Sequence, residues 1–146
     1  MFVRVFMVVL ITALFQQKQW VAVQSVQTTL ENDRLMIEID LDVMEGYHIQ
    51  ATDPEDPYLV ATRLYLDLPE ALSLQQIDFP PAKAFQLEGS EDVMRVYSGI
   101  VSVKLLVEIK GGLPENQILS GTLEYQACDT AKCYYPRRLD FEIPLK

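Results

Sequence analysis

The chain has 146 residues, which is long enough for one folded domain without structural metals. Of these residues 49% are hydrophobic, a fraction too high for a disordered protein. Its 21 acidic and 12 basic residues give a net charge of −9. This charge repels phosphate backbones, and only the Arg137-Arg138 pair offsets it locally, so we expect no nucleic acid partner.

The first nineteen residues have the layout of a secretory signal peptide. A positive charge at Arg4 precedes an apolar run from Val5 to Phe15, and polar residues follow. The run is too short to span a bilayer, which takes about twenty apolar residues. We therefore expect residues 1–19 to direct export to the periplasm or outside the cell, where disulfides persist, and residues 20–146 to form the domain. The alternatives are a buried first strand and an uncleaved anchor.

From Trp20 onward the dominant hydrophobic period is two, as strands with one wet face require. In LMIEIDLDV, apolar residues from Leu35 to Val43 alternate with acidic residues. The same alternation predicts strands at 63–68, 101–109, 121–127 and 138–145. Weaker patterns predict strands at 21–29, 72–79 and 93–97.

Turn signals rich in Gly, Pro, Asn and Asp separate these segments, and no stretch of ten or more residues has the 3.6 period of a helix. Seven or eight short antiparallel strands, each with one apolar face, must bury that face against another sheet. The sequence therefore predicts a single all-β domain, an antiparallel β-sandwich of immunoglobulin-like type.

The two cysteines of the chain, Cys128 and Cys133, flank a short segment between the last two predicted strands, in EYQACDTAKCYYP. Opposite positions of an antiparallel pair have Cα atoms about 5.5 Å apart, which permits a disulfide. A loop this short stabilises little, on the order of 2 kcal/mol against about 4.7 for a hundred-residue loop. A bridge at an exposed turn is also accessible to an attacking thiolate. The spacing leaves two interpretations open, a structural staple and an exchanging disulfide.

A metal site is not expected from this composition. Structural zinc takes four nitrogen or sulfur ligands, and the chain offers two cysteines and one histidine, His48. The cysteine spacing also differs from the Cys-x-x-Cys motif of thioredoxin-like proteins. We expect neither a metal nor another cofactor.

The segment YQACDTAKCYYP, with GYHIQATDPEDPYLVATRLYLDLP upstream, resembles the N-terminal, periplasmic domain of the DsbD thiol:disulfide interchange proteins. In that family a Tyr-Gln-x-Cys stretch leads into a short loop, a second cysteine and an exit that contains proline. The resemblance covers residues 24–146. It implies a periplasmic domain with an immunoglobulin fold, in agreement with the strand pattern.

The resemblance further implies a redox shuttle that acts as a component of a protein-disulfide reductase. The dithiol form would pass two electrons to an oxidised partner and would then be reduced again. Cys128 and Cys133 would be the exchanging pair, with Cys133 entering the mixed disulfide and Cys128 resolving it. Lys132 and Arg137 would stabilise a thiolate at Cys133, whereas Asp129 would disfavour one at Cys128.

The partners implied by the resemblance are thioredoxin-fold proteins, as electron donor and as electron acceptor. The family's membrane electron conduit and C-terminal thioredoxin-like domain do not follow the last predicted strand, so we expect either a separate donor protein, with a separate conduit, or no donor. The rival hypothesis, from another class of protein, is a non-catalytic exported β-sandwich for binding or structure, in which the disulfide only pins a hairpin.

Several further residues are candidate neighbours of the redox pair. In the family, the segment that contains His48 and Gln50 borders the cysteines, and an imidazole near a thiol can stabilise the thiolate. The favoured alternative for His48 is a partly exposed strand-end residue with no role.

Aromatic residues form the second group of candidates. Phe85 lies in a segment that resembles the family's cap over the cysteines, although Phe85 or Phe79 filling the sandwich core is the favoured alternative. Tyr125, Tyr134 and Tyr135 could form an aromatic docking rim, but strands favour tyrosine in any case.

Overall fold

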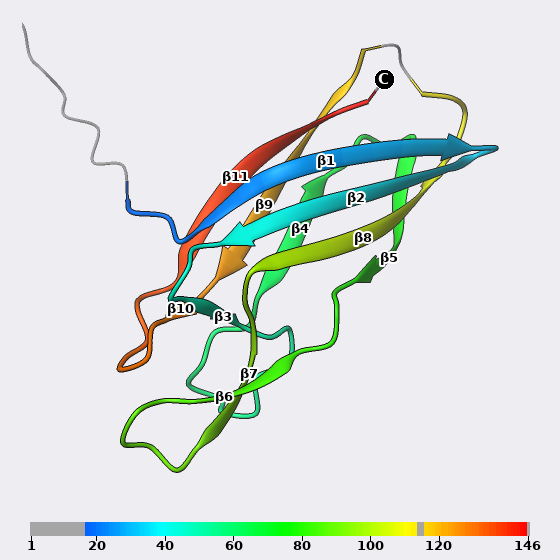
Figure 1. The fold of residues 1–146 in the computed structure, drawn as a ribbon. Coiled ribbons are helices and arrows are strands. Elements are labelled where there is room, and N and C mark those ends of the chain that lie inside the picture. The colour runs from blue at the N-terminus through cyan, green and yellow to red at the C-terminus, as the bar shows by residue number, and fades with distance from the viewer. Residues whose placement is uncertain (1–16, 114–115, 146) are drawn as a thin grey trace, which may run out of the picture.

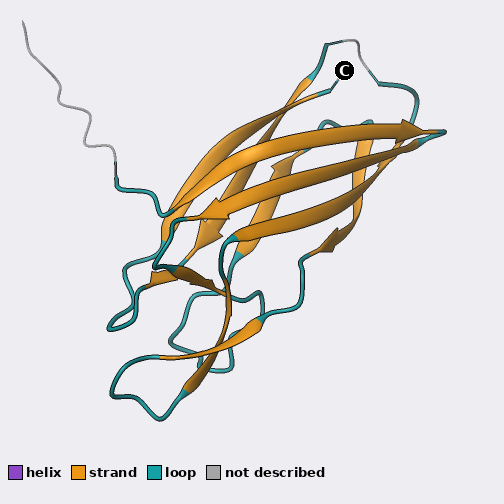
Figure 2. Ribbon diagram, viewed as in Figure 1, coloured by secondary structure: helices purple, strands orange, loops and turns teal. Residues whose placement is uncertain are grey.

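A computed structural model of the protein describes residues 17–113 and 116–145 (Figure 1). The predicted signal peptide therefore lies outside the described residues except for its last three, and export stays a prediction. Every regular element in the described ranges is a β-strand (Figure 2). These ranges contain no helix long and apolar enough to cross a membrane. The strands are β1 (Val21–Glu31), β2 (Arg34–Val43), β3 (His48–Gln50), β4 (Arg63–Asp67), β5 (Leu72–Asp78), β6 (Lys83–Gln86), β7 (Val93–Tyr97), β8 (Ile100–Ile109), β9 (Ile118–Tyr125), β10 (Ala127–Cys128) and β11 (Arg137–Pro144).

Two antiparallel sheets form the body of the molecule, a four-stranded sheet in the order β1-β2-β8-β5 and a three-stranded sheet in the order β11-β9-β4 (Figure 1). Along β2 and β8, every second side chain is buried, as the alternation in the sequence predicted. The buried side chains of both sheets belong to one hydrophobic core. The predicted immunoglobulin-like antiparallel β-sandwich is confirmed.

All eight predicted strands are present, but two short strands, β3 and β6, were not predicted. All three residues of β3 are buried, so this strand has no alternation to detect. The predicted strand 121–127 is divided, because β9 ends at Tyr125 in the three-stranded sheet and β10 pairs with β3 in a different one. This change of sheet carries the first cysteine out of the sandwich.

A third sheet, in the order β10-β3-β7-β6, lies at one end of the sandwich (Figure 1). It has a small hydrophobic core of its own, separate from the core of the sandwich. Met94, Val96 and Cys128 are buried in this second core, and the partly buried side chains packed against them are those of Leu59, Phe85, Leu87 and Cys133. We call this group the cysteine cluster. The two cysteines therefore lie beside the sandwich and not within it.

Tyr125, the last residue of β9, anchors the strand that leads to the cysteines. Its ring is fully buried in the sandwich core. Its hydroxyl accepts a hydrogen bond from the Trp20 backbone amide at 3.0 Å and donates one to Gln19 Oε1 at 2.6 Å. Burial raises the pKa of this phenol, so the hydroxyl keeps its proton. The start of the described chain is thus fixed beside the hairpin that carries the two cysteines.

Candidate redox site

Cys128 and Cys133 form a disulfide, and their Cα atoms lie 3.9 Å apart. The two residues pair as an isolated antiparallel bridge across a tight turn. The Asp129 amide donates to the Lys132 carbonyl at 2.9 Å inside this turn, and the Tyr134 amide donates to the Ala127 carbonyl at 2.8 Å outside it. The predicted hairpin-like turn is confirmed, with the Cα atoms closer than the expected distance of about 5.5 Å.

The Asp129 carboxylate organises the turn between the cysteines. Its Oδ1 accepts hydrogen bonds from the amides of Ala131 and Lys132, both at 2.8 Å, and its Oδ2 accepts one from the Tyr134 hydroxyl at 2.6 Å. The Tyr134 bond, followed by the two amides, lowers the pKa of Asp129 to about 2. The same bond raises the pKa of Tyr134 to about 12. Asp129 is therefore ionised and Tyr134 is neutral across the physiological range.

The two sulfurs differ in their access to solvent. Cys128 is fully buried, whereas Cys133 is partly exposed and lines a cleft of about 510 Å³. The expectation of an exposed bridge is therefore right for Cys133 and wrong for Cys128, because the third sheet and its cluster enclose the first cysteine. An incoming thiolate can reach only the sulfur that faces solvent, so this geometry favours attack at Cys133.

Gln50 places a hydrogen-bond donor beside both sulfurs. Its side chain is fully buried, and its Nε2 lies 3.2 Å from Cys128 Sγ, 3.9 Å from Cys133 Sγ and 3.5 Å from Met94 Sδ. A disulfide sulfur has lone pairs and no hydrogen, so the amide nitrogen is the end that must face it. The Gln50 Oε1 atom accepts no hydrogen bond from the described residues. The predicted neighbour Gln50 does lie beside the disulfide.

His48 is the cross-strand partner of Cys128 in the pairing of β3 with β10. Its side chain is 5% exposed, so the favoured expectation of a partly exposed histidine is wrong. The ring lies 3.7 Å from the Phe85 ring, centroid to centroid. Burial lowers the pKa of His48, and the negative charge of Asp129 opposes the shift only in part. His48 is therefore neutral at neutral pH.

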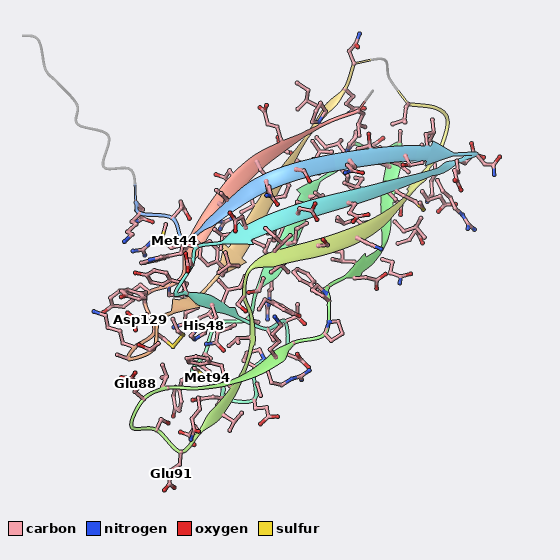
Figure 3. The ribbon with its side chains drawn as sticks, viewed as in Figure 1. Met44, His48, Glu88, Glu91, Met94 and Asp129 are labelled. Carbon is pink, nitrogen blue, oxygen red and sulfur yellow. A yellow bond between two sulfur atoms is a disulfide. The ribbon has the colours of Figure 1, made fainter. Side chains whose placement is uncertain are left out.

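Phe85 and the loop after β6 cover the disulfide. Phe85 lies opposite Met94 in the pairing of β6 with β7 and belongs to the cysteine cluster, so the expectation that it fills the sandwich core is wrong. Phe79 does pack against the sandwich core. The Glu88 amide donates a 2.9 Å hydrogen bond to the Thr130 carbonyl, which ties this loop to the redox turn. Figure 3 shows Glu88, Met94, His48 and Asp129 around the disulfide. We call Phe85, Leu87 and Glu88 the cap.

The three tyrosines predicted as a docking rim have different positions. Tyr125 is fully buried and cannot contact a partner. Tyr134 is half-buried and packs against Trp20, with ring centroids 4.6 Å apart, and against Tyr47 at 6.1 Å. Tyr135 is 85% exposed. Only Tyr135 of the three presents its whole ring to solvent.

The cations expected to act on Cys133 lie over aromatic rings instead. Lys132 Nζ is 5.0 Å from the centroid of the Tyr134 ring, and the Arg137 guanidinium is 5.2 Å from that of Trp20. Cation–π contacts of this kind hold the two side chains against the rings of Tyr134 and Trp20. These contacts give both cations an aromatic partner, and whether either charge stabilises a thiolate at Cys133 stays a prediction.

Gln126, inside the Tyr-Gln-Ala-Cys motif, holds the segments around the turn together and was not among the predicted site residues. Its Oε1 accepts a hydrogen bond from the Val60 amide at 2.7 Å, and its Nε2 donates one to the Tyr134 carbonyl at 3.1 Å. The backbone carbonyl of Gln126 also accepts from the Gln50 amide at 3.1 Å. Gln126 therefore joins the segment after β3 to the exit of the redox turn. The one feature of the sequence that could have pointed to Gln126 was its place between Tyr125 and Cys128 in the Tyr-Gln-Ala-Cys motif.

Comparison with known proteins identifies the family. Residues 16–144 match the family model described as the N-terminal domain of the thiol:disulfide interchange protein DsbD. The chain belongs to the DsbD N-terminal domain family. The disulfide between Cys128 and Cys133 agrees with a thiol:disulfide interchange domain.

One solved structure supports the fold. The N-terminal periplasmic domain of ScsB from Proteus mirabilis superposes with a TM-score of 0.57 at 15% identity, over 82% of this chain and 44% of that one. The N-terminal domain of DsbD from Neisseria meningitidis, in its reduced form, gives a TM-score of 0.49 at 17% identity and covers 82% of each chain. The chain thus spans less than half the length of the ScsB structure. A search among curated protein sequences gave no significant match.

Proposed function

We propose that this protein is a periplasmic thiol:disulfide interchange domain that passes two electrons to oxidised partner proteins through Cys128 and Cys133. One observation carries the proposal: the disulfide has one enclosed sulfur and one sulfur at a cleft, inside a small core that a loop covers. A staple for the sandwich would join its two sheets, whereas this bridge spans five positions and lies beside them.

In the reduced domain, the Cys133 thiolate attacks one sulfur of a partner's disulfide, and the partner's other sulfur leaves as a thiolate. The Cys128 thiolate then attacks Cys133 Sγ, and the partner sulfur bound to Cys133 leaves as a thiolate. Two electrons pass to the partner, which becomes a dithiol, and the domain becomes the disulfide form. Recharging reverses these steps: a donor thiolate attacks the accessible Cys133 Sγ, and Cys128 leaves as a thiolate. The donor's second thiolate then attacks the donor sulfur bound to Cys133, so that Cys133 leaves as a thiolate and the donor becomes a disulfide.

Gln50 and His48 act on the enclosed sulfur in this scheme. A thiolate that forms at the buried Cys128 loses its contact with water, and the Gln50 Nε2 group, at 3.2 Å, donates a hydrogen bond in its place. The neutral His48 ring fills the space beside Cys128 and supports the cap through Phe85. Both are positioning residues, and the two cysteines alone undergo the bond changes.

The electron donor and acceptor in this proposal are thioredoxin-fold proteins, and a membrane electron conduit supplies the donor. The periplasmic location rests on the signal-like residues 1–19 and on the family. The cap narrows access to the pair, so that thiols reach it only through Cys133 at the cleft. Tyr135, fully exposed beside the exit of the turn, lies where an incoming partner would contact an aromatic ring.

Trapping the mixed disulfide tests this function. With Cys128→Ser, the resolving thiol is absent, so Cys133 should accumulate as a covalent adduct with an oxidised thioredoxin-fold protein on non-reducing gels. The matched control Cys133→Ser leaves only the enclosed Cys128 and should form little adduct. If neither variant forms an adduct under several oxidant conditions, the interchange function is wrong.

The reduction potential separates this function from that of a structural β-sandwich. An exchanging pair should equilibrate with glutathione or dithiothreitol buffers above about −300 mV, because inert disulfides of secreted proteins typically lie below that value. A lower potential, with partner binding unchanged on reduction, would instead support the structural role.

A further inference from the structure

The cleft beside Cys133 has the features of a recognition site. Two segments form its walls, one after β3 and one between β6 and β7, and its volume is about 510 Å³. Gln50, Met94 and Cys133 contribute to its lining, so an occupant lies against the accessible sulfur. A volume in this range is typical of sites that bind small ligands or a few residues of a peptide.

The charges on the cleft walls are mainly negative. Glu55 and Asp56 lie on one wall, and Glu91 and Asp92 lie on the other. All four side chains are exposed, and none forms an ion pair within residues 17–113 and 116–145. In Figure 3, Glu91 lies at the outer tip of the β6–β7 loop. We call this the acidic cleft.

The nearby cations do not neutralise the acidic cleft. Arg95 is the one cation in its lining, and the guanidinium is ion-paired with Asp53, which is outside the lining. Lys132 and Arg137, on the redox hairpin, lie over the rings of Tyr134 and Trp20. The four wall carboxylates therefore have no ion-pair partner among the described residues.

Gln50 supplies a second, independent feature that points to an occupant. Its side chain is fully buried and lines the cleft, and its Oε1 has no hydrogen-bond partner among the described residues. A buried acceptor without a partner is unfavourable and is suited to a donor that arrives with a ligand. A backbone amide next to the partner's cysteine is such a donor.

Resting on the function proposed above, we propose that the acidic cleft selects partner segments in which the reactive cysteine is flanked by Lys or Arg. Carboxylates at exposed positions contribute modestly one by one, but several around one cleft raise the association rate of a cationic segment. A cation beside the partner's sulfur also lowers the pKa of its thiol, which makes it a better leaving group. Cations beside the partner's cysteine therefore raise both the rate of association with the cleft and the rate of thiol–disulfide exchange.

Matched peptides test this inference. Three peptides carry one cysteine in a disulfide with mercaptoethanol, and the cysteine is flanked on both sides by lysine, glutamine or glutamate. The reduced domain becomes the disulfide, and each peptide releases its free thiol and mercaptoethanol. Rates are divided by those of the same peptides with dithiothreitol, which removes differences in intrinsic reactivity. We expect the order lysine, glutamine, glutamate, with at least about tenfold between the extremes at low salt.

Salt and surface variants identify the source of the preference. The ratio of the normalised rates of the lysine and glutamate peptides should shrink severalfold at about 0.5 M salt, where charges are screened within a few ångströms. The double variant Glu91→Gln with Asp92→Asn should reduce the preference for the lysine peptide over the glutamate peptide severalfold. The control, Glu31→Gln with Asp33→Asn, removes the same charge at the turn between β1 and β2, at the opposite end of the molecule (Figure 1).

The outcomes distinguish this inference from the proposed function. Equal normalised rates for the three peptides, or a preference that survives the Glu91 and Asp92 substitutions, would overturn the selection of cationic partners and leave the interchange function intact. If no peptide oxidises the reduced domain, the interchange function fails as well.

Discussion

The Glu88 backbone amide donates a 2.9 Å hydrogen bond to the Thr130 carbonyl, across 42 positions of sequence, and so fastens the cap to the turn between the two cysteines. Phe85 and Leu87, just before Glu88, pack in the cysteine cluster. The cap is therefore closed by one backbone bond and a few apolar contacts. Such a closure can open locally without unfolding the sandwich.

Removing this amide should speed reduction of the disulfide. Glu88→Pro eliminates the donor, and the loss of one hydrogen bond worth about 1 kcal/mol shifts the opening of the cap roughly fivefold. The measurement is the rate of reduction by dithiothreitol under native conditions. Glu88→Ala keeps the amide and serves as the matched control. Equal rates in the two variants would show that the Glu88 bond does not hold the cap.

Replacing Gln50 should separate activity from stability. In Gln50→Leu the leaving Cys128 thiolate loses its hydrogen-bond donor, and reduction by dithiothreitol should slow by roughly tenfold, the scale of a hydrogen bond to a charged group. The thermal midpoint of the oxidised domain should not fall, because the substitution also removes the unpartnered Oε1 atom. Gln27→Leu, on the exposed side of β1, controls for the change in polarity. An unchanged rate would exclude the proposed role of the amide.

His48 should make stability depend on pH below its ordinary pKa. Burial lowers the pKa of His48 from 6.5, so below pH 6.5 the unfolded chain takes up a proton that the folded protein does not. Stability is therefore complete above pH 6.5 and falls as the pH drops towards the lowered value. His48→Phe retains an aromatic ring against Phe85 and should remove this dependence. Urea unfolding midpoints between pH 4 and pH 8, compared in the two proteins, are the measurement.

Asp129 should act in a lower pH window. Its pKa is lowered from 3.8 to about 2, so the ionised carboxylate stabilises the folded hairpin above pH 3.8. This contribution is lost as the pH falls through about 2. Asp129→Ala removes the acceptor of three hydrogen bonds and should lower the thermal midpoint at neutral pH, with the difference from the original protein shrinking as the pH falls from 3.8 through about 2. A difference that stays constant with pH would contradict this role.

The sequence was most informative where a property repeats along the chain. Alternating burial along β2, β8 and β11 follows from the two-residue period of a strand, which is local and independent of which strands pair. The same pattern required a second sheet to cover the apolar face, and hence the sandwich. The paired cysteines at a tight turn were also predicted, because the hairpin lies within one short segment. β3 and β6 escaped prediction because strands of three and four residues are too short to show a period.

By itself, the sequence determined an all-strand domain with a cysteine pair at a hairpin, since both follow from neighbours in the chain. Only the tertiary structure decided that His48, Gln50, Phe85 and Met94 surround that pair, that Cys128 is enclosed and that Cys133 faces an acidic cleft. These residues come from separate strands, and their meeting depends on the order β10-β3-β7-β6 of the third sheet. Strand order is fixed by the packing of distant segments, which no local period in the sequence records.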